Sequence, residues 1–160
     1  MGDGSLMGLD MYLSAKKYYS GGSWRSEADF KTFNELKAIS GVGQHMTTQL
    51  PSVQLEVSVG YWRKANAVHQ FFVDNCQNGE DDCRTSYVGR DKLEELKVLC
   101  EQIVLTPALA EEQLPATDGF FFGSQEYGEH YIEDLKTTIE IVERCLQMPD
   151  DWEFYYHSSW

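Results

Sequence analysis

Alternating apolar and polar residues mark several segments of the chain as β-strands. The clearest is 52–59, where every second residue is apolar, which predicts a strand with one dry face and one polar face. Residues 9–14 and 152–157 show the same period, and 86–88 form a shorter extended run. The aromatic C-terminal strand is expected to dock on the sheet. The alternating apolar positions are Leu9, Met11, Leu13, Val53, Leu55, Val57, Val59, Trp152, Phe154 and Tyr156.

Other segments have the three-and-four spacing of helices that bury one face. They are 27–38, capped by Ser26 or Asp29, and the longer stretches 61–76, 90–104 and 126–147. The predicted buried faces of the last three are Tyr61, Ala65, Val68, Phe72 and Cys76, then Leu93, Leu96, Cys100 and Ile103, then Tyr127, Tyr131, Leu135, Thr138, Val142 and Cys145.

Glycine and proline set the expected boundaries between these elements. Gly60 is expected to end the strand 52–59 and to start the helix that follows it. The stretches 40–52 and 107–119 are rich in Gly, Pro and polar residues and are predicted to be loops. The three adjacent side chains of 120–122, all Phe, cannot all face one side of a strand, so we expect both faces to be covered there.

Together these elements predict an α+β fold, with a small mixed or antiparallel sheet covered by about three main helices. A chain of 160 residues suits one domain, which we expect to span 7–160. Residues 1–6 are small and polar and precede a second Met, so we interpret them as a tag remnant or a disordered leader.

The composition is that of a globular protein of a reducing compartment. No apolar run approaches the roughly 18 residues that span a bilayer, and the N-terminus lacks a secretory signal pattern, so we expect a cytoplasmic protein with no membrane contact. We therefore expect Cys76, Cys83, Cys100 and Cys145 to be reduced structural thiols. Their spacing does not match a zinc site.

The net charge of −13 is carried by the C-terminal part of the chain. Residues 1–70 have a net charge of +1 and residues 71–160 a net charge of −14. This balance disfavours direct nucleic-acid binding, because phosphate contacts need cations. It leaves two interpretations, a well-solvated surface or an acidic face for a basic partner. The candidate interaction cluster lies at the start of the longest helix and contains Glu126, Glu129, Glu133 and Asp134.

A second set of residues suggests a ligand pocket. Trp62, Asn66 and His69 recur at helical spacing, with Arg63 beside them, and they combine a ring, an amide, an imidazole and a cation. Arg63 is suited to grip an anion, Trp62 to stack on a ring and His69 to move a proton. Ser124, Tyr155 and His157 are the further candidates, from the loop before the longest helix and from the last strand. The alternative is that Trp62 and His69 belong to the core.

The sequence contains no known catalytic signature. Ser40-Gly41-Val42-Gly43 has only part of a dinucleotide motif and follows a predicted helix. The acidic loop 74–82 lacks the ligand spacing of a calcium-binding hand, so a solvated turn is the better interpretation. The sequence therefore predicts neither a metal nor a cofactor, and it favours a binding protein over an enzyme.

Four motifs of the chain resemble those of a known group of proteins. They are Met7-Gly8-Leu9-Asp10-Met11-Tyr12-Leu13, Gly60-Tyr61-Trp62-Arg63-Lys64-Ala65-Asn66, Gly119-Phe120-Phe121-Phe122-Gly123-Ser124 and Phe154-Tyr155-Tyr156-His157-Ser158-Ser159-Trp160. With them the chain resembles a family of small proteins carried by bacteriophages and prophages. The resemblance runs from Met7 to the last residue and assigns no catalytic residues. It implies an accessory role in the bacterial cytoplasm during infection, directed at host metabolism or defence.

Two functions follow as hypotheses. The first is a phage accessory protein that binds a host protein with a basic surface through the acidic cluster, with defence proteins among the candidate partners. The second is a binder of, or enzyme acting on, a nucleotide or another phosphate-bearing metabolite, through the Trp62, Arg63 and His69 pocket. The oligomeric state is not predicted by either hypothesis.

Overall fold

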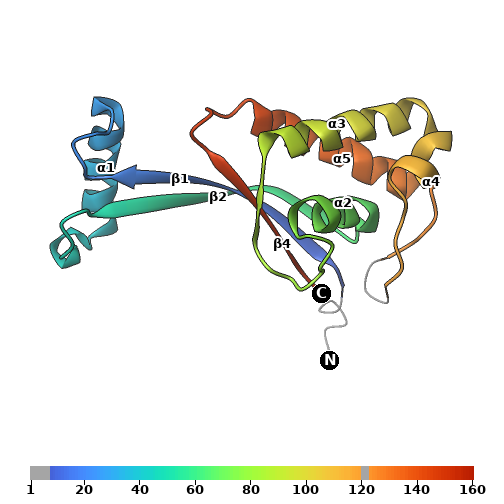
Figure 1. Cartoon of the computed structure of the whole chain (residues 1–160), viewed down its shortest axis with the longest axis horizontal. Coiled ribbons are helices and arrows are strands. Elements are labelled where there is room, and N and C mark those ends of the chain that lie inside the picture. The colour runs from blue at the N-terminus through green and yellow to red at the C-terminus, as the bar shows by residue number, and fades with distance from the viewer. Residues whose placement is uncertain (1–7, 120–122) are drawn as a thin grey trace. The chain divides into compact units, whose positions relative to one another are not determined.

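The computed structural model describes residues 8–119 and 123–160 (Figure 1). Strands and helices alternate irregularly along the chain, with the last strand separated from the others in sequence by a long helical stretch. The elements are β1 (Asp10–Ser20), α1 (Glu27–Ser40), the 3-10 helix η1 (Gly43–His45), β2 (Ser52–Arg63), α2 (Asn66–Cys76), β3 (Ser86–Val88), α3 (Arg90–Leu105), the 3-10 helix η2 (Pro107–Leu109), α4 (Ala110–Gln113), α5 (Glu129–Leu146) and β4 (Glu153–Ser159).

The strands of the described residues form one four-stranded antiparallel sheet in the order β2-β1-β4-β3. β1 and β2 pair as a long hairpin, whose backbone hydrogen bonds include Gly21 N to Pro51 O at one end and Lys64 N to Leu9 O at the other. β4 lies between β1 and β3, and Tyr155 is the register partner of Tyr87. The C-terminal strand is therefore an internal strand of the sheet.

The chain divides into two compact units. The main unit contains the chain up to Ala15 together with Ser58–Trp160, and the hairpin unit contains Lys16–Val57. The sequence does not predict this division, because the polar stretch 40–52 has the composition of an ordinary loop. By sequence the main unit has a net charge of −14 and the hairpin unit a net charge of +1.

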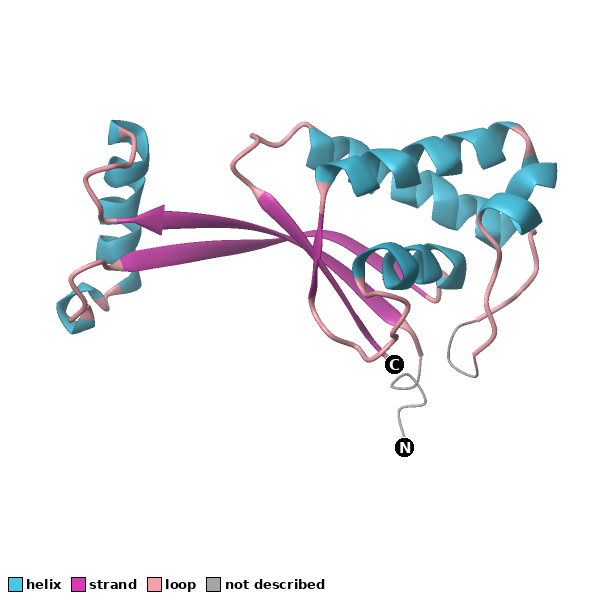
Figure 2. Ribbon diagram, viewed as in Figure 1, coloured by secondary structure: helices cyan, strands magenta, loops and turns pink. Residues whose placement is uncertain are grey.

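The core of the main unit lies between one face of the sheet and the helices α2, α3 and α5 (Figure 2). Alternation along each strand sends one set of side chains into this core, and Figure 1 shows α3 and α5 running side by side over it. The central side chains are fully buried and come from every layer, among them Met11, Leu13, Phe72, Leu93, Leu96, Leu135, Val142, Phe154 and Tyr156.

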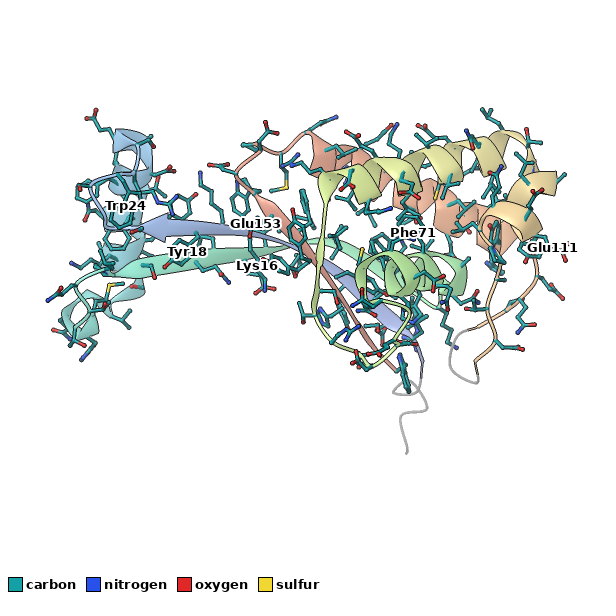
Figure 3. The ribbon with its side chains drawn as sticks, viewed as in Figure 1. Lys16, Tyr18, Trp24, Phe71, Glu111 and Glu153 are labelled. Carbon is teal, nitrogen blue, oxygen red and sulfur yellow. The ribbon has the colours of Figure 1, made fainter. Side chains whose placement is uncertain are left out.

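The hairpin unit has a small core of its own. Helix α1 starts at the predicted cap Ser26, whose side chain accepts a hydrogen bond from Asp29 N. Its buried residue is Phe33, which packs so closely on Gly21 that a side chain there would meet the ring at 3.0 Å. Large side chains elsewhere in this unit stay exposed, including Trp24, which Figure 3 labels together with Lys16 and Tyr18.

The structure confirms the α+β class and most of the predicted packing. The predicted faces of α3 and α5 are buried, apart from Tyr127, which is only partly buried and precedes α5. β4 buries Phe154 and Tyr156 as expected, while Trp152 is partly buried beside the core.

One boundary prediction was wrong. β2 continues through Gly60 to Arg63, and α2 begins only at Asn66. Gly60 is a close-packing position within the strand, because a Cβ there would lie 2.7 Å from Ile141 Cγ2. The chain turns at Lys64, which has a left-handed φ of 58°.

Further predictions need correction or lie outside the described residues. The dry face of 52–59 is only partly buried, and Val57 is 44% exposed. The predicted loop 107–119 contains η2 and α4. The interpretations of residues 1–6 and of 120–122 lie outside the described residues.

Candidate functional site

A cavity of about 270 Å³ opens between the start of α2 and the first turns of α5. We call it the α2–α5 pocket. Arg63 and Lys64 contribute to its wall from the turn before α2, and Ser124 from the loop before α5. The residues on α5 that line it include His130 and Asp134, while Glu126 lines it from the preceding loop.

Asn66 holds the two sides of this pocket together. Its side-chain nitrogen donates to Ser124 O at 2.9 Å, and its side-chain oxygen accepts from Thr117 N at 3.0 Å. The side chain is buried, and a buried amide that meets backbone partners on both atoms fixes its neighbours in place. Asn66 therefore shapes the pocket by anchoring the start of α2 to the connection between α4 and α5.

The pocket carries charge of both signs. Arg63 and Lys64 bring cations, whereas Glu126 and Asp134 bring carboxylates. Burial raises the pKa of Asp134 to about 6, and the neighbouring His130 opposes that rise. A pocket with this wall is suited to a small molecule that carries a positive and a negative group, because each group then meets its opposite.

We expect Asp134→Asn to change the pH dependence of stability. Because folding raises the pKa of Asp134 above its ordinary 3.8, its contribution to stability falls as pH rises from about 4 to about 6. In the variant, stability should no longer fall over this pH range. Near pH 7 its free energy of unfolding should exceed that of the wild type by about 1 kcal/mol, after allowance for screening of a partly exposed carboxyl. Urea denaturation at both ends of that pH range measures the effect. The change Glu140→Gln, at an exposed position on the same helix, is the control, and an unaltered pH profile in Asp134→Asn contradicts the expectation.

The structure brings only part of the predicted pocket together. Arg63, Asn66 and Ser124 line the α2–α5 pocket. Trp62 does not, because it belongs to β2 rather than to the helix and points into the core. It is 3% exposed, and its Nε1 donates to Thr138 Oγ1 at 2.9 Å. The alternative interpretation of Trp62 as a core residue is the correct one.

His69 is also a core residue. It is fully buried, with Nδ1 lying 2.7 Å from the Tyr156 hydroxyl and Nε2 lying 2.9 Å from an Asp81 carboxylate oxygen. Both ring nitrogens are thus engaged by the protein, and the ring does not line the α2–α5 pocket. This arrangement ties α2 to the last strand and to the loop that contains Asp81, which is a structural role.

The remaining candidates lie on the other side of the sheet. Tyr155 and His157 alternate with buried residues of β4, so they belong to the face opposite the core. The Tyr155 hydroxyl donates to Glu153 at 3.1 Å. The His157 ring stacks on Tyr12, with centroids 4.8 Å apart. Neither residue joins the α2–α5 pocket.

The acidic candidates divide between the pocket and the surface. Glu126 and Asp134 line the pocket, while Glu129 and Glu133 are exposed on α5. Sequence reasoning missed Lys64 and His130 as pocket residues. His130 and Asp134 lie four residues apart on one helix, so their side chains share a face. This spacing could have identified them as neighbours from the sequence.

The cysteines are free, and three have raised thiol pKa values. Burial raises the pKa of Cys100 to about 12 and that of Cys76 and Cys145 to about 11. Because the thiolate is the reactive form, we expect Cys100 and Cys145 to react slowly. Thiol titration with and without denaturant measures this. Fewer than four thiols in the denatured, unreduced protein would reveal a disulfide.

Comparison with known proteins gives no match to a protein family, to a curated sequence or to a solved structure. Within the described ranges, none of the helices combines the length and the apolar character needed to cross a membrane. Among the same residues, no cluster of three or more His, Cys, Asp or Glu side chains is arranged to hold a metal ion.

Proposed function

We propose that the chain is a non-enzymatic binding protein that recognises a basic surface on another protein. The resemblance to proteins of bacteriophages suggests the setting, the cytoplasm of an infected bacterium, and hence a host protein as the partner, with defence proteins among the candidates. The observation that carries the proposal is the charge of the main unit, −14 by sequence, with 12 of its 22 acidic residues on helices.

Charge of this size acts mainly on the rate of association. An acidic surface attracts a basic partner over roughly the 10 Å Debye length at 0.1 M salt and suppresses encounters with acidic ones. Glu129 and Glu133 are exposed near the start of α5, next to the half-buried Asp134, and are suited to this steering role. The same charge disfavours nucleic acid as the partner, because it repels phosphate.

We expect Glu129→Lys combined with Glu133→Lys to slow association with the partner and to weaken its salt dependence, because the double reversal removes attractive charge without touching the core. The measurement is capture from host lysate on the wild-type protein, followed by association kinetics at two salt concentrations with the captured partner. Lys136→Glu, an exposed change of opposite sign on the same helix, is the matched control and should not slow association. Association that is independent of salt and of both changes contradicts the proposal.

The α2–α5 pocket supports a second candidate, binding of a small metabolite with a phosphate or another anionic group. The observation in its favour is that Arg63 and Lys64 meet in one cavity with the first turn of α2, where Ala67 and Val68 also line the wall. Thermal shift with a nucleotide panel tests this candidate, since a ligand at a hundred times its Kd adds about 2.7 kcal/mol of stability. Arg63→Ala and Lys64→Ala should abolish the shift, whereas the α5 reversals should leave it.

A further inference from the structure

The face of the sheet opposite the core carries five rings, from all four strands. Alternation along the strands puts Tyr61 of β2, Tyr12 of β1, Tyr155 and His157 of β4, and Tyr87 of β3 on this side, and we call these five residues the aromatic face. Their chain neighbours confirm the assignment, because Met11, Trp62, Phe154, Tyr156 and Val88 are all buried in the core.

The rings touch in two sets, Tyr61, Tyr12 and His157 over β2, β1 and β4, and Tyr155 with Tyr87 over β4 and β3. The Tyr12 centroid lies 5.5 Å from that of Tyr61 and 4.8 Å from that of His157, with which it stacks at an angle of 14°. Tyr87 and Tyr155 are register partners, and their centroids lie 5.8 Å apart. Tyr61 is 50% exposed and Tyr87 57% exposed. Single exposed aromatic residues are ordinary, but several rings gathered on one face of a sheet indicate a binding surface.

Carboxylates accompany these rings. The Tyr61 hydroxyl donates to Asp10 at 2.5 Å, and the Tyr155 hydroxyl donates to Glu153, which Figure 3 labels at the start of β4. The hydrogen bond to Asp10 raises the pKa of Tyr61, and the nearby cation Arg63 acts in the opposite sense. The aromatic face thus places rings beside carboxylates that bear negative charge, on a unit with a net charge of −14.

We propose that the aromatic face is the contact surface of the chain, and that its occupant is an extended, arginine-rich segment of a protein. This inference rests on the proposed function and names the surface and the kind of segment. A guanidinium group is planar and weakly hydrated, so it stacks on an aromatic ring while donating hydrogen bonds to a carboxylate. Tyr61 with Asp10 and Tyr155 with Glu153 each offer that pair of partners.

Two kinds of ligand stack on exposed aromatic residues of a sheet, an arginine-rich segment and a single-stranded nucleic acid, and the charge around the rings distinguishes them. Single-stranded nucleic acid also stacks on such rings, but it needs a basic groove for its backbone. Here the charged groups paired with the rings are carboxylates. An arginine-rich segment meets both features, whereas a nucleic acid meets only the rings.

Long-range steering of the partner and short-range contact with it are then made by different parts of the main unit. The exposed acids of α5 act at long range and set the association rate, whereas the aromatic face makes the short-range contacts that set the dissociation rate. The two sets of variants are therefore expected to affect different kinetic constants.

The test uses the full chain and a fluorescein-labelled peptide of alternating Arg and Ser, followed by anisotropy and by stopped-flow dissociation. Tyr61→Ala combined with Tyr87→Ala removes the two most exposed rings and should weaken binding about ten-fold, chiefly through faster dissociation. Tyr61→Phe with Tyr87→Phe keeps the ring faces and should retain most of the affinity. Trp24→Ala, which removes a 64% exposed ring from the hairpin unit, is the matched control and should bind as the wild type does. Melting curves check that each variant is folded.

The outcomes separate this inference from the proposed function. If the wild type binds neither the Arg peptide nor a Lys peptide of the same length, the proposed function fails together with the inference. If the wild type binds and the alanine pair binds equally well, the proposed function stands and the aromatic face is not the contact surface. Equal affinity for the Lys peptide, or tighter binding of a labelled oligo-dT strand, overturns the choice of an arginine-rich occupant.

Discussion

Deleting residues 152–160 is expected to abolish cooperative folding. β4 lies between β1 and β3, so its loss leaves β3 without a neighbour and exposes an edge of β1. Phe154 and Tyr156 are buried, and the Tyr156 ring stacks on Phe72 with centroids 4.2 Å apart. Each large side chain contributes about 1.5–3 kcal/mol by burial, and the total stability of a domain is only about 5–15 kcal/mol.

The control for this deletion is a shorter one that removes only Ser159 and Trp160. Trp160 is 47% exposed, and its Nε1 donates to Asp81 at 3.2 Å, so we expect a small loss of stability and an intact melting transition. Calorimetry together with near-ultraviolet circular dichroism distinguishes the two truncations. A soluble 1–151 chain that melts cooperatively would show that β4 is dispensable for the core.

Elements whose hydrophobic period is regular were predictable from sequence. Leu93, Leu96, Cys100 and Ile103 recur at helical spacing, and these are the residues that α3 buries. The alternation of Phe154 and Tyr156 with polar neighbours likewise identified β4 as a strand. In both elements the buried face follows from local spacing, because one side of each packs on the core and the other meets solvent.

The boundary between β2 and α2 was not predictable in the same way. Local rules treat a glycine after a strand as a breaker, but Gly60 is retained within β2 because Ile141 packs against its backbone. That contact joins residues 81 positions apart, so no local pattern contains it. The error moved Trp62 from strand to helix and created the false row of Trp62, Asn66 and His69.

The candidate site could also be predicted only in part, because it too depends on contacts between distant residues. Arg63, Asn66 and Ser124 were chosen for their chemistry, and the fold places them in one cavity. Trp62 and His69 were chosen on equal grounds, but their partners Thr138 and Tyr156 lie 76 and 87 residues further along the chain. Whether a polar aromatic residue faces a pocket or the core depends on such distant partners, which a single sequence does not reveal.

His69→Ala is expected to destabilise the main unit by about 3 kcal/mol. The change removes a fully buried ring together with its hydrogen bonds to the Tyr156 hydroxyl and the Asp81 carboxylate. Loss of a hydrogen-bonded partner in the core costs about 1–3 kcal/mol, and the cavity adds to that. For a chain of this size the melting temperature should fall by about 10 °C. His45→Ala, at an exposed position in η1, is the control and should melt as the wild type does.

The same variant decides between the two roles considered for His69. If it is the structural link between α2, β4 and the Asp81 loop, stability falls and the Asp81 loop loosens, which hydrogen exchange across 77–85 reports directly. Tyr156→Phe should then reproduce part of the loss, because it removes one of the two hydrogen bonds while keeping the ring that stacks on Phe72. If instead His69→Ala keeps its melting temperature but loses binding of a small ligand, the imidazole serves a site, and the α2–α5 pocket becomes the leading candidate for the working surface.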